Sequence, residues 1–219
     1  MTTFPRSPRL LKGGIVLVDP ATGAVKRIIA LQYNPDSLTR SLQVQMVPGD
    51  TPDRAEALRL LGPPVETFKL EAEIDATDQL EQPDQNRATV DAGIFPQLAA
   101  LETIIYPTSQ QLILNNDLAR QGTLEIAPIQ APLTLFIWSA RRIVPVKFTE
   151  FSITEEAFDT ALNPIRAKVS LGMRVLSVND LGFEHKGGSL FLAYHQQKER
   201  LAGLTSAATF GTLGITGIP

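Results

Sequence analysis

The sequence predicts a mainly β protein with antiparallel strands, on three observations. Apolar and polar residues alternate along 68–75 and again along 165–175, which is the pattern of a strand with one buried face. Segments rich in Asp, Asn, Pro and Gly separate the apolar stretches, as turns separate the strands of hairpins. The segments that favour a helix are few, with 96–106 and 189–201 the clearest, so helices are expected to be a minor part of the fold.

The N-terminal part is expected to form a short arm and then a hairpin. Residues 14–18 are a β-branched run, and 19–23 contain the Asp, Pro and Gly that turns use. Residues 25–33 are expected to return as the second strand of this hairpin.

A second turn, at 34–36, leads into the next predicted strand. One period-2 face of this strand is apolar except at Arg40, and its apolar side chains are Leu38, Leu42, Val44 and Met46. The other face is polar, so the alternation predicts a strand that is half exposed to water. Residues 47–64 are expected to form a loop, in which 52–61 could form a short helix.

The alternating strand at 68–75 is followed by the polar, acidic segment 76–86, which is expected to be a loop. Helical spacing of apolar residues predicts a helix over 96–106, carried by Leu98, Leu101 and Ile105. Pro107 would end this helix. The pattern in 108–130 does not distinguish a helix from other structures.

The second half of the chain predicts a long hairpin. The apolar run 133–138 predicts a buried strand with a turn after it. In the strand that follows, the apolar residues change from even to odd positions near Thr149 and Glu150, which a β-bulge would produce. A turn at 162–164 then precedes 165–175, whose alternation is longer than the usual strand of about 5–6 residues.

The C-terminal part is expected to hold a helix over 189–201 and then a tail. No charged residue follows Arg200, and the remaining residues contain four glycines and no periodic pattern. This composition favours a flexible segment. Its apolar side chains could dock on a neighbouring molecule, namely Phe210, Leu213, Ile215 and Ile218.

Composition and charge exclude several classes of protein. Of the 219 residues, 43% are hydrophobic and 20% are charged, as in ordinary globular domains. The chain has no cysteine, which rules out disulfides and thiolate chemistry, and its net charge of −3 argues against a nucleic-acid partner. The most apolar stretch is about half of the roughly 20 residues that a bilayer span needs. We therefore expect a cytoplasmic protein with no direct membrane insertion.

The sequence offers little for catalysis, and we expect no enzyme activity, no cofactor and no metal site. The two histidines, His185 and His195, belong to no metal-binding motif, and the chain contains no phosphate-binding glycine loop and no nucleophile elbow. Acidic residues recur every three positions within 75–84 and could meet a hard cation: Asp75, Asp78, Glu81 and Asp84. A metal-dependent enzyme built on this segment is one alternative, and a solvated acidic loop explains the same pattern.

Four separated segments are distinctive: LQYNPDSL at 31–38, PVETFKLEAEID at 64–75, PLTLFIW at 132–138 and FSITEEAFDTALNPIRAKVSLGMRVLS at 151–177. Together they resemble the tube-type proteins of contractile injection systems, the phage-tail-like particles that drive a rigid tube through a target envelope. Within this group the chain is most similar to the baseplate hub protein that adapts the inner tube to the spike. Many of those proteins continue into a LysM-type module, whereas this chain ends in its uncharged tail.

The resemblance, which covers most of 10–185, implies a split antiparallel β-barrel with one packed helix, a long hairpin and a C-terminal helix. It also implies that six copies form a ring, in which strands of neighbours join into one continuous barrel around a lumen. The barrel domain would occupy 14–185, between an N-terminal arm at 1–13 and a C-terminal helix and tail at 186–219.

The resemblance and the alternation together place two sets of candidate assembly residues on the long hairpin. The loop over 155–163 would reach the next ring or a partner through Glu155, Glu156, Phe158, Asp159 and Asn163. One face of the strand at 165–175 would fill the core. Its other face would line the lumen or meet a neighbour through Arg166, Lys168, Ser170 and Arg174.

The function that follows is structural: a hexameric adaptor ring that links the spike or hub to the inner tube and templates tube assembly. The expected partners are copies of the chain itself, the spike or hub protein, the inner tube or its initiator, and other baseplate components, within a tail-like particle. The main inner tube subunit is the nearest alternative. A monomeric binding module with a discrete ligand pocket is an alternative of another class.

Overall fold

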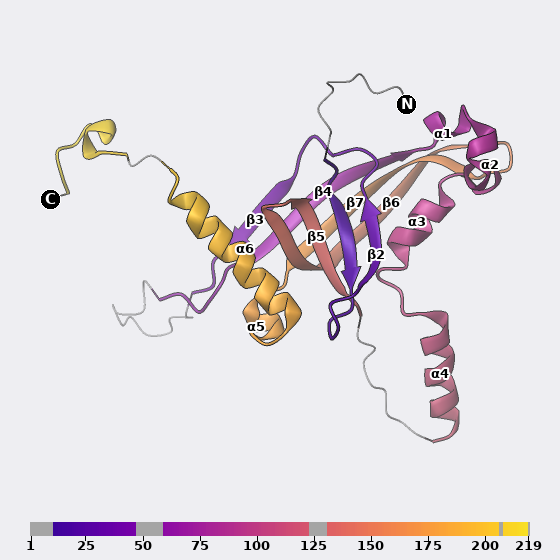
Figure 1. The fold of residues 1–219 in the computed structure, drawn as a ribbon, viewed down its shortest axis with the longest axis horizontal. Helices are drawn as coiled ribbons and strands as arrows, with labels where there is room; N and C mark the ends of the chain where they lie inside the picture. The colour runs from indigo at the N-terminus through magenta and orange to yellow at the C-terminus, as the bar shows by residue number, and fades with distance from the viewer. Residues whose placement is uncertain (1–10, 47–58, 123–130, 206–207, 219) are drawn as a thin grey trace.

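The computed structural model describes residues 11–46, 59–122, 131–205 and 208–218 (Figure 1). The described strands are β1 (Gly14–Val18), β2 (Val25–Ala30), β3 (Thr39–Gln43), β4 (Val65–Asp75), β5 (Leu133–Ser139), β6 (Arg142–Phe158) and β7 (Pro164–Val175). The helices are α1 (Thr77–Leu80), α2 (Arg87–Ala92), α3 (Phe95–Glu102), α4 (Ser109–Arg120), α5 (Val178–Leu181) and α6 (Lys186–Ala202), with short 3-10 turns η1 (Pro83–Gln85) and η2 (Phe210–Leu213). The prediction of a mainly β fold is confirmed.

All seven strands belong to one antiparallel sheet, in the order β2-β1-β5-β6-β7-β4-β3. Two hairpins, β1–β2 and β3–β4, flank the central meander of β5, β6 and β7. Among the described residues, β2 and β3 each pair on one side only, so they form the two edges of the sheet.

The sheet curls strongly, so that strands far apart in its order meet through their side chains. Phe68 of β4 and Phe136 of β5 have ring centroids 5.4 Å apart, although β7 and β6 lie between these strands. In a flat sheet, three strand spacings would separate the two backbones by about 14 Å. The inner, concave face therefore encloses the core, to which α3 contributes Leu98 and Leu101 and α6 contributes Phe191 and Tyr194.

A side chain links the two edge regions of the curled sheet at one end. Gln32, two residues after β2, donates its amide N–H to the backbone carbonyl of Asp75 at 2.6 Å. It also accepts the backbone N–H of Asp75 through Oε1 at 3.0 Å. Gln32 thus supplies to the end of β4 the donor and acceptor that a neighbouring strand would supply, and it contributes to the curled shape of the sheet.

The β-bulge predicted near Thr149 and Glu150 is confirmed. Phe148 lies opposite Met173 and Glu150 lies opposite Gly172, so Thr149 is the extra residue on β6. A Cβ atom on Gly172 would come within 2.8 Å of Glu150 Cβ, so only glycine fits opposite the bulge. The bulge explains why the buried positions of β6 change from even to odd along the strand.

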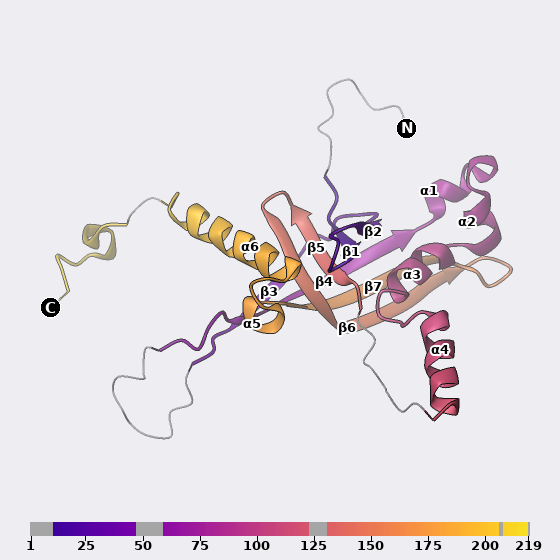
Figure 2. The ribbon, with the colours of Figure 1, turned by 60° about the horizontal axis from the view of Figure 1, so that its bottom comes forward.

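Small helices cover only part of the outer face of the sheet. Leu181 of α5 and Leu190 of α6 pack against a second apolar cluster on β1 and β5, made of Val18, Leu133 and Leu135. Figure 2 shows α5 and α6 beside one end of the sheet, and α1, α2 and α3 beside the opposite end. The described helices include none that is long and apolar enough to cross a bilayer.

Several local expectations were wrong. The strand at β3 is exposed on both faces rather than on one, because it lies at the edge of the sheet. The helix predicted over 96–106 is present as α3 with Leu98 and Leu101 buried, but it ends at Glu102, and Ile104 rather than Ile105 is buried. The segment 76–86 contains α1 and η1 instead of an irregular loop. The possible helix at 52–61 lies almost wholly outside the described residues.

Two further segments, 189–201 and 108–130, can be compared with the helices of the structure. The helix expected at 189–201 is present and begins three residues earlier, after His185, whose Nδ1 accepts the backbone N–H of Gly187 at 3.0 Å. The ambiguous segment 108–130 contains α4. The short helix α5 was not expected.

Candidate functional site

A broad polar surface occupies the outer face of β4, β7 and β6, and we call it the polar face. Residues directly opposite each other in an antiparallel sheet point to the same side. By this register the polar face holds Lys69, Glu71, Glu73 and Asp75 of β4, Arg166, Lys168, Ser170 and Arg174 of β7, and Lys147, Glu150, Ser152 and Thr154 of β6. All four β7 residues predicted to line a lumen or meet a neighbour thus share one face.

Ion pairs join the strands of the polar face, two of them between neighbouring strands and one from β4 to β6 over Gly172 of β7. The pairs are Arg166 Nε with Asp75 Oδ2 at 2.8 Å, Lys168 Nζ with Glu156 Oε1 at 2.8 Å, and Lys69 Nζ with Glu150 Oε2 at 2.9 Å. A fourth pair, Arg174 with Asp180 at 2.8 Å, ties β7 to α5. Pairs this exposed add about 0–1 kcal/mol each to stability. Their main effect is to leave the face hydrophilic, with both signs of charge interleaved.

Three of these ion-paired side chains are held in their charged forms, namely Asp75, Arg166 and Lys168. Partial burial acts to raise the pKa of Asp75, but hydrogen bonds from Thr77 and Arg166 outweigh it, and the net pKa is lowered. The hydrogen bond to Asp75 raises the pKa of Arg166, and the one to Glu156 raises the pKa of Lys168. These side chains therefore keep their charges across the neutral pH range.

The tip of the β6–β7 hairpin is a compact turn. Asp159 accepts the backbone N–H groups of Ala161 and Asn163, both at 2.8 Å, and the side-chain amide of Asn163 at 2.9 Å. The hydrogen bonds from Asn163 lower the pKa of Asp159. Asn163 also donates to the carbonyl of Asp91 at 3.3 Å, which braces the tip against α2.

The predicted loop at 155–163 is shorter than expected. Glu155, Glu156 and Phe158 lie in β6, which continues to Phe158, and only 159–163 form the turn. A second irregularity in register lies between Glu155 and Ala157, and it places Glu156 beside Lys168. Phe158 is half exposed, next to the turn that holds Asp159 and Asn163. Their role in contacts between rings stays a prediction.

A buried carboxylate that the sequence analysis did not single out fixes α6 to the sheet. Glu66 of β4 is 2% exposed and accepts hydrogen bonds from Tyr194 Oη at 2.8 Å and Lys198 Nζ at 2.7 Å. Arg40 Nε of β3 lies 3.8 Å from Glu66 Oε1. Burial, followed by the hydrogen bond to Glu66, raises the pKa of Tyr194 to about 12. Two signals existed in the sequence: Arg40 interrupts an apolar face, and Tyr194 and Lys198 are four residues apart on one helix.

We expect Glu66→Leu to lower the free energy of unfolding by about 2 kcal/mol, since a buried tyrosine hydroxyl and a half-buried ammonium lose a charged acceptor. Urea unfolding followed by circular dichroism measures the loss. The matched control is Glu150→Leu, which removes a carboxylate from an exposed pair and is expected to change stability by less than about 0.5 kcal/mol. Equal losses for the two variants would contradict the role of Glu66.

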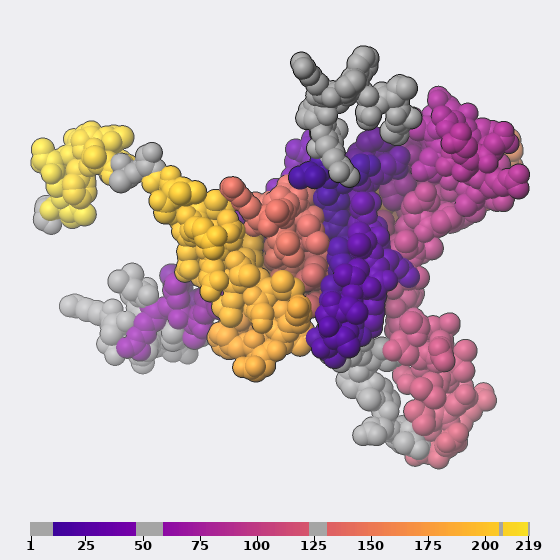
Figure 3. All heavy atoms as spheres, viewed as in Figure 1, coloured from indigo at the N-terminus to yellow at the C-terminus, as the bar shows by residue number. Residues whose placement is uncertain are grey.

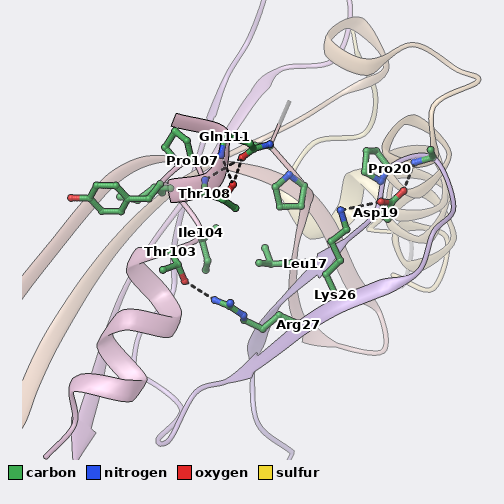
Figure 4. Close-up of a pocket in the computed structure, with 15 residues that line it drawn as sticks. Leu17, Asp19, Pro20, Lys26, Arg27, Thr103, Ile104, Pro107, Thr108 and Gln111 are labelled. Atoms are coloured by element: carbon green, nitrogen blue, oxygen red, sulfur yellow. Dashed lines mark hydrogen bonds and ion pairs between the residues drawn. The ribbon is translucent and has the colours of Figure 1, made fainter. Parts of the chain in front are cut away.

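A groove of about 570 Å³ lies between the β1–β2 hairpin and the segment that joins α3 to α4 (Figure 4). Arg27 spans it by donating to Thr103 Oγ1 at 2.6 Å, and Lys26 pairs with Asp19 at 2.9 Å near the hairpin turn. Hydrogen bonds from the backbone of Thr22, and then from Lys26, lower the pKa of Asp19. The charged groups of the groove, Asp19, Lys26 and Arg27, are therefore already partnered within the chain.

The acidic segment at 75–84 is not arranged as a metal site. Within the described residues, no three His, Cys, Asp or Glu side chains are placed to hold a metal ion together. Asp75 is bound by Arg166 and by both the backbone and the hydroxyl of Thr77. Asp78 lies in α1 and Asp84 in η1, on separate turns.

The comparisons with known proteins give little support of their own. No protein family model matches the chain, and no curated protein matches it. One solved structure that it matches is the tail of an empty GTA particle with C6 symmetry, at 12% identity and a TM-score of 0.29. The match covers 75% of this chain and 90% of that chain. A likeness this distant carries no weight for fold or function.

Proposed function

We propose that this chain is a structural subunit of a contractile injection particle, in which six copies form an adaptor ring between the spike and the inner tube. The observation that carries the proposal is the curled, open sheet. Its two edge strands pair with no second strand among the described residues, and its outer face is polar over β4, β7 and β6. The resemblance of four sequence segments to tube-type proteins supports the same conclusion.

The edge strand β2 offers hydrogen-bond donors to a neighbour. Leu31 donates its backbone N–H to Gly13 at 2.9 Å, across the β1–β2 ladder. Because donors alternate along an antiparallel strand, the N–H groups of Ile29 and Arg27 also point to β1. Those of Ile28 and Ala30 point to the free edge. In the proposed ring they pair with β3 of the next copy, and a ring leaves no edge unpaired.

The opposite edge carries an apolar stripe that a neighbour would cover. Leu42 lies opposite Glu66, on the side of the sheet that encloses the core. Val44 and Met46 continue that side past the end of β3, and Met46 bridges to Leu60. All four apolar side chains of this stripe are about half exposed or more: Leu42, Val44, Met46 and Leu60. Joining β3 to a neighbour's β2 would bring apolar surface of the second copy over this stripe.

In the ring, the polar face lines the lumen and the hairpin tip at 159–163 contacts the next layer. Ion-paired rows of both signs give the lumen a hydrated wall without a strong net charge, which suits passage of varied cargo. The braced tip is a firm contact point for stacking. The adaptor thereby matches the spike and other baseplate components on one side and offers a sixfold template to the inner tube on the other.

The main inner tube subunit is a second candidate within the same class. Two features favour the adaptor: the helix α4, which projects from the body, and the segment after α6, which extends away from it (Figures 1 and 2). Such projections would disturb a uniform stack of identical rings. We propose 14–185 as the barrel domain and 186–219 as its C-terminal extension, although Tyr194 ties α6 to the sheet.

Native mass spectrometry of the purified chain, alone and with the spike protein encoded beside it, tests the proposal. We expect a six-copy species, either spontaneous or formed only when the spike is present. The same experiment distinguishes the candidates, because a tube subunit would form long stacks without a spike. A strict monomer in both conditions would contradict the ring and favour a monomeric binding module.

A further inference from the structure

The helix α4 and the turn before it present an apolar surface that the described residues leave exposed. We call this surface the elbow and define it by Ile105, Tyr106, Leu112 and Ile113, which are all exposed. No side chain of α4 is buried, yet its start is well defined by a capping box between Thr108 and Gln111. An isolated helix of 12 residues is marginal in water, and packing usually supplies its stability. A partner on the elbow would supply that packing.

A second apolar segment that the described residues leave exposed is 208–218, which we call the C-terminal arm. Phe210 begins its only regular turn, η2, and four large apolar side chains of the arm are exposed: Phe210, Leu213, Ile215 and Ile218. The arm holds no charged residue, because Arg200 is the last charge in the sequence.

The elbow and the arm match each other in charge and lie at opposite ends of the molecule. The sequence from Thr103 to Asn116 also lacks any charge, so neither surface repels the other or leaves an unpaired ion. Helix α4 lies at one end of the long axis, whereas α6 leads to the arm at the other end (Figures 1 and 3). Two different complementary surfaces at opposite ends are what a head-to-tail contact between identical copies requires.

We infer that the C-terminal arm of one copy packs on the elbow of the next copy around the ring. This inference rests on the proposed ring and adds a second contact to strand pairing. An arm of 11 described residues is too small to form a stable interface alone, since standard interfaces bury about 800 Å² on each partner. The arm instead adds a stabilising contact to the interface that the edge strands form.

Disulfide crosslinking tests the contact directly, because the natural chain has no cysteine. The test pair is Ile113→Cys with Phe210→Cys in one chain, assembled with the spike and oxidised. We expect covalent species of two to six chains on a denaturing gel, because a disulfide forms only where the two Cα atoms come within about 7 Å. Mixing the two single-cysteine variants should give linked dimers and nothing larger.

The matched control pair is Leu162→Cys with Phe210→Cys, since Leu162 is even more exposed than Ile113 but lies at the hairpin tip. If the arm is held on the elbow, the yield of crosslinked chains from the test pair should exceed that of this control about tenfold or more. A six-copy species without crosslinks in the test pair would overturn the arm contact and leave the ring intact. A link within one chain would overturn it as well, and a failure to form any multimer would overturn the ring and the arm contact together.

Discussion

Replacing Ile28 by proline is expected to abolish the six-copy species and leave the monomer folded. Ile28 lies on the edge strand β2, and its N–H points away from β1 to the free edge. Proline removes that donor without breaking the β1–β2 ladder, and proline is tolerated on edge strands for this reason. In the proposed ring, losing one hydrogen bond of about 1 kcal/mol at each of six interfaces would cost about 6 kcal/mol of assembly free energy. Native mass spectrometry with the spike measures the remaining six-copy species.

The matched control is Ile28→Ala, which keeps the backbone donor and removes the side chain, 70% of which is exposed. This variant should still form the ring. Circular dichroism and thermal unfolding of both variants show whether the monomer is intact. If Ile28→Pro assembles as well as Ile28→Ala while both remain folded, strand pairing through β2 is wrong and another surface must join the copies.

Truncating Phe68 to alanine is expected to cause the largest loss of stability, about 3–5 kcal/mol. Phe68 is fully buried, and it joins distant parts of the sheet through the ring of Phe136 and the guanidinium of Arg142, 5.8 Å from its centroid. The cavity left by alanine would lie at the centre of the curl, where α3 and several strands leave little room to collapse. Urea unfolding measures the change in free energy.

Phe158→Ala serves as the matched control for this prediction. Phe158 is half exposed near the hairpin tip, so its loss should cost no more than about 1 kcal/mol. A loss for Phe68→Ala as small as that of the control would mean that β4 and β5 do not pack against each other, and the curled form of the sheet would be refuted. A selective defect of Phe158→Ala in stacking would instead support its predicted role between rings.

Local patterns were sufficient to predict the strands and even a detail of their register. Alternation along 165–175 identified the buried face of β7, and the change of period near Thr149 located the bulge opposite Gly172. Both signals depend only on neighbours in the chain. The register of β7 with its two neighbours puts Arg166, Lys168, Ser170 and Arg174 on one face, and that this face lines a lumen or meets a neighbour stays a prediction.

Features that depend on contacts across the fold could not be read from local patterns. The curl that brings Phe68 to Phe136 depends on four strands together, and the position of β3 at an edge decides its exposure. The buried ion cluster joins Glu66 to Lys198, 132 residues away. Helical spacing pointed to Ile105, but α3 ends at Glu102. The turn that follows the helix buries Ile104 instead and leaves Ile105 exposed.

The length of β6 has a mechanical consequence for the proposed role of the chain in an injection particle. Its 17 residues span about 56 Å at roughly 3.3 Å per residue, and most of that length is bonded to β7. A thrust along the hairpin loads these hydrogen bonds in shear, so that all of them must yield at once. A force that pulls the two strands apart at the tip would break the hydrogen bonds one after another, beginning at the tip. The subunit is therefore strong along the hairpin and weak across it, and a hairpin aligned with the direction of ejection would transmit force without unfolding.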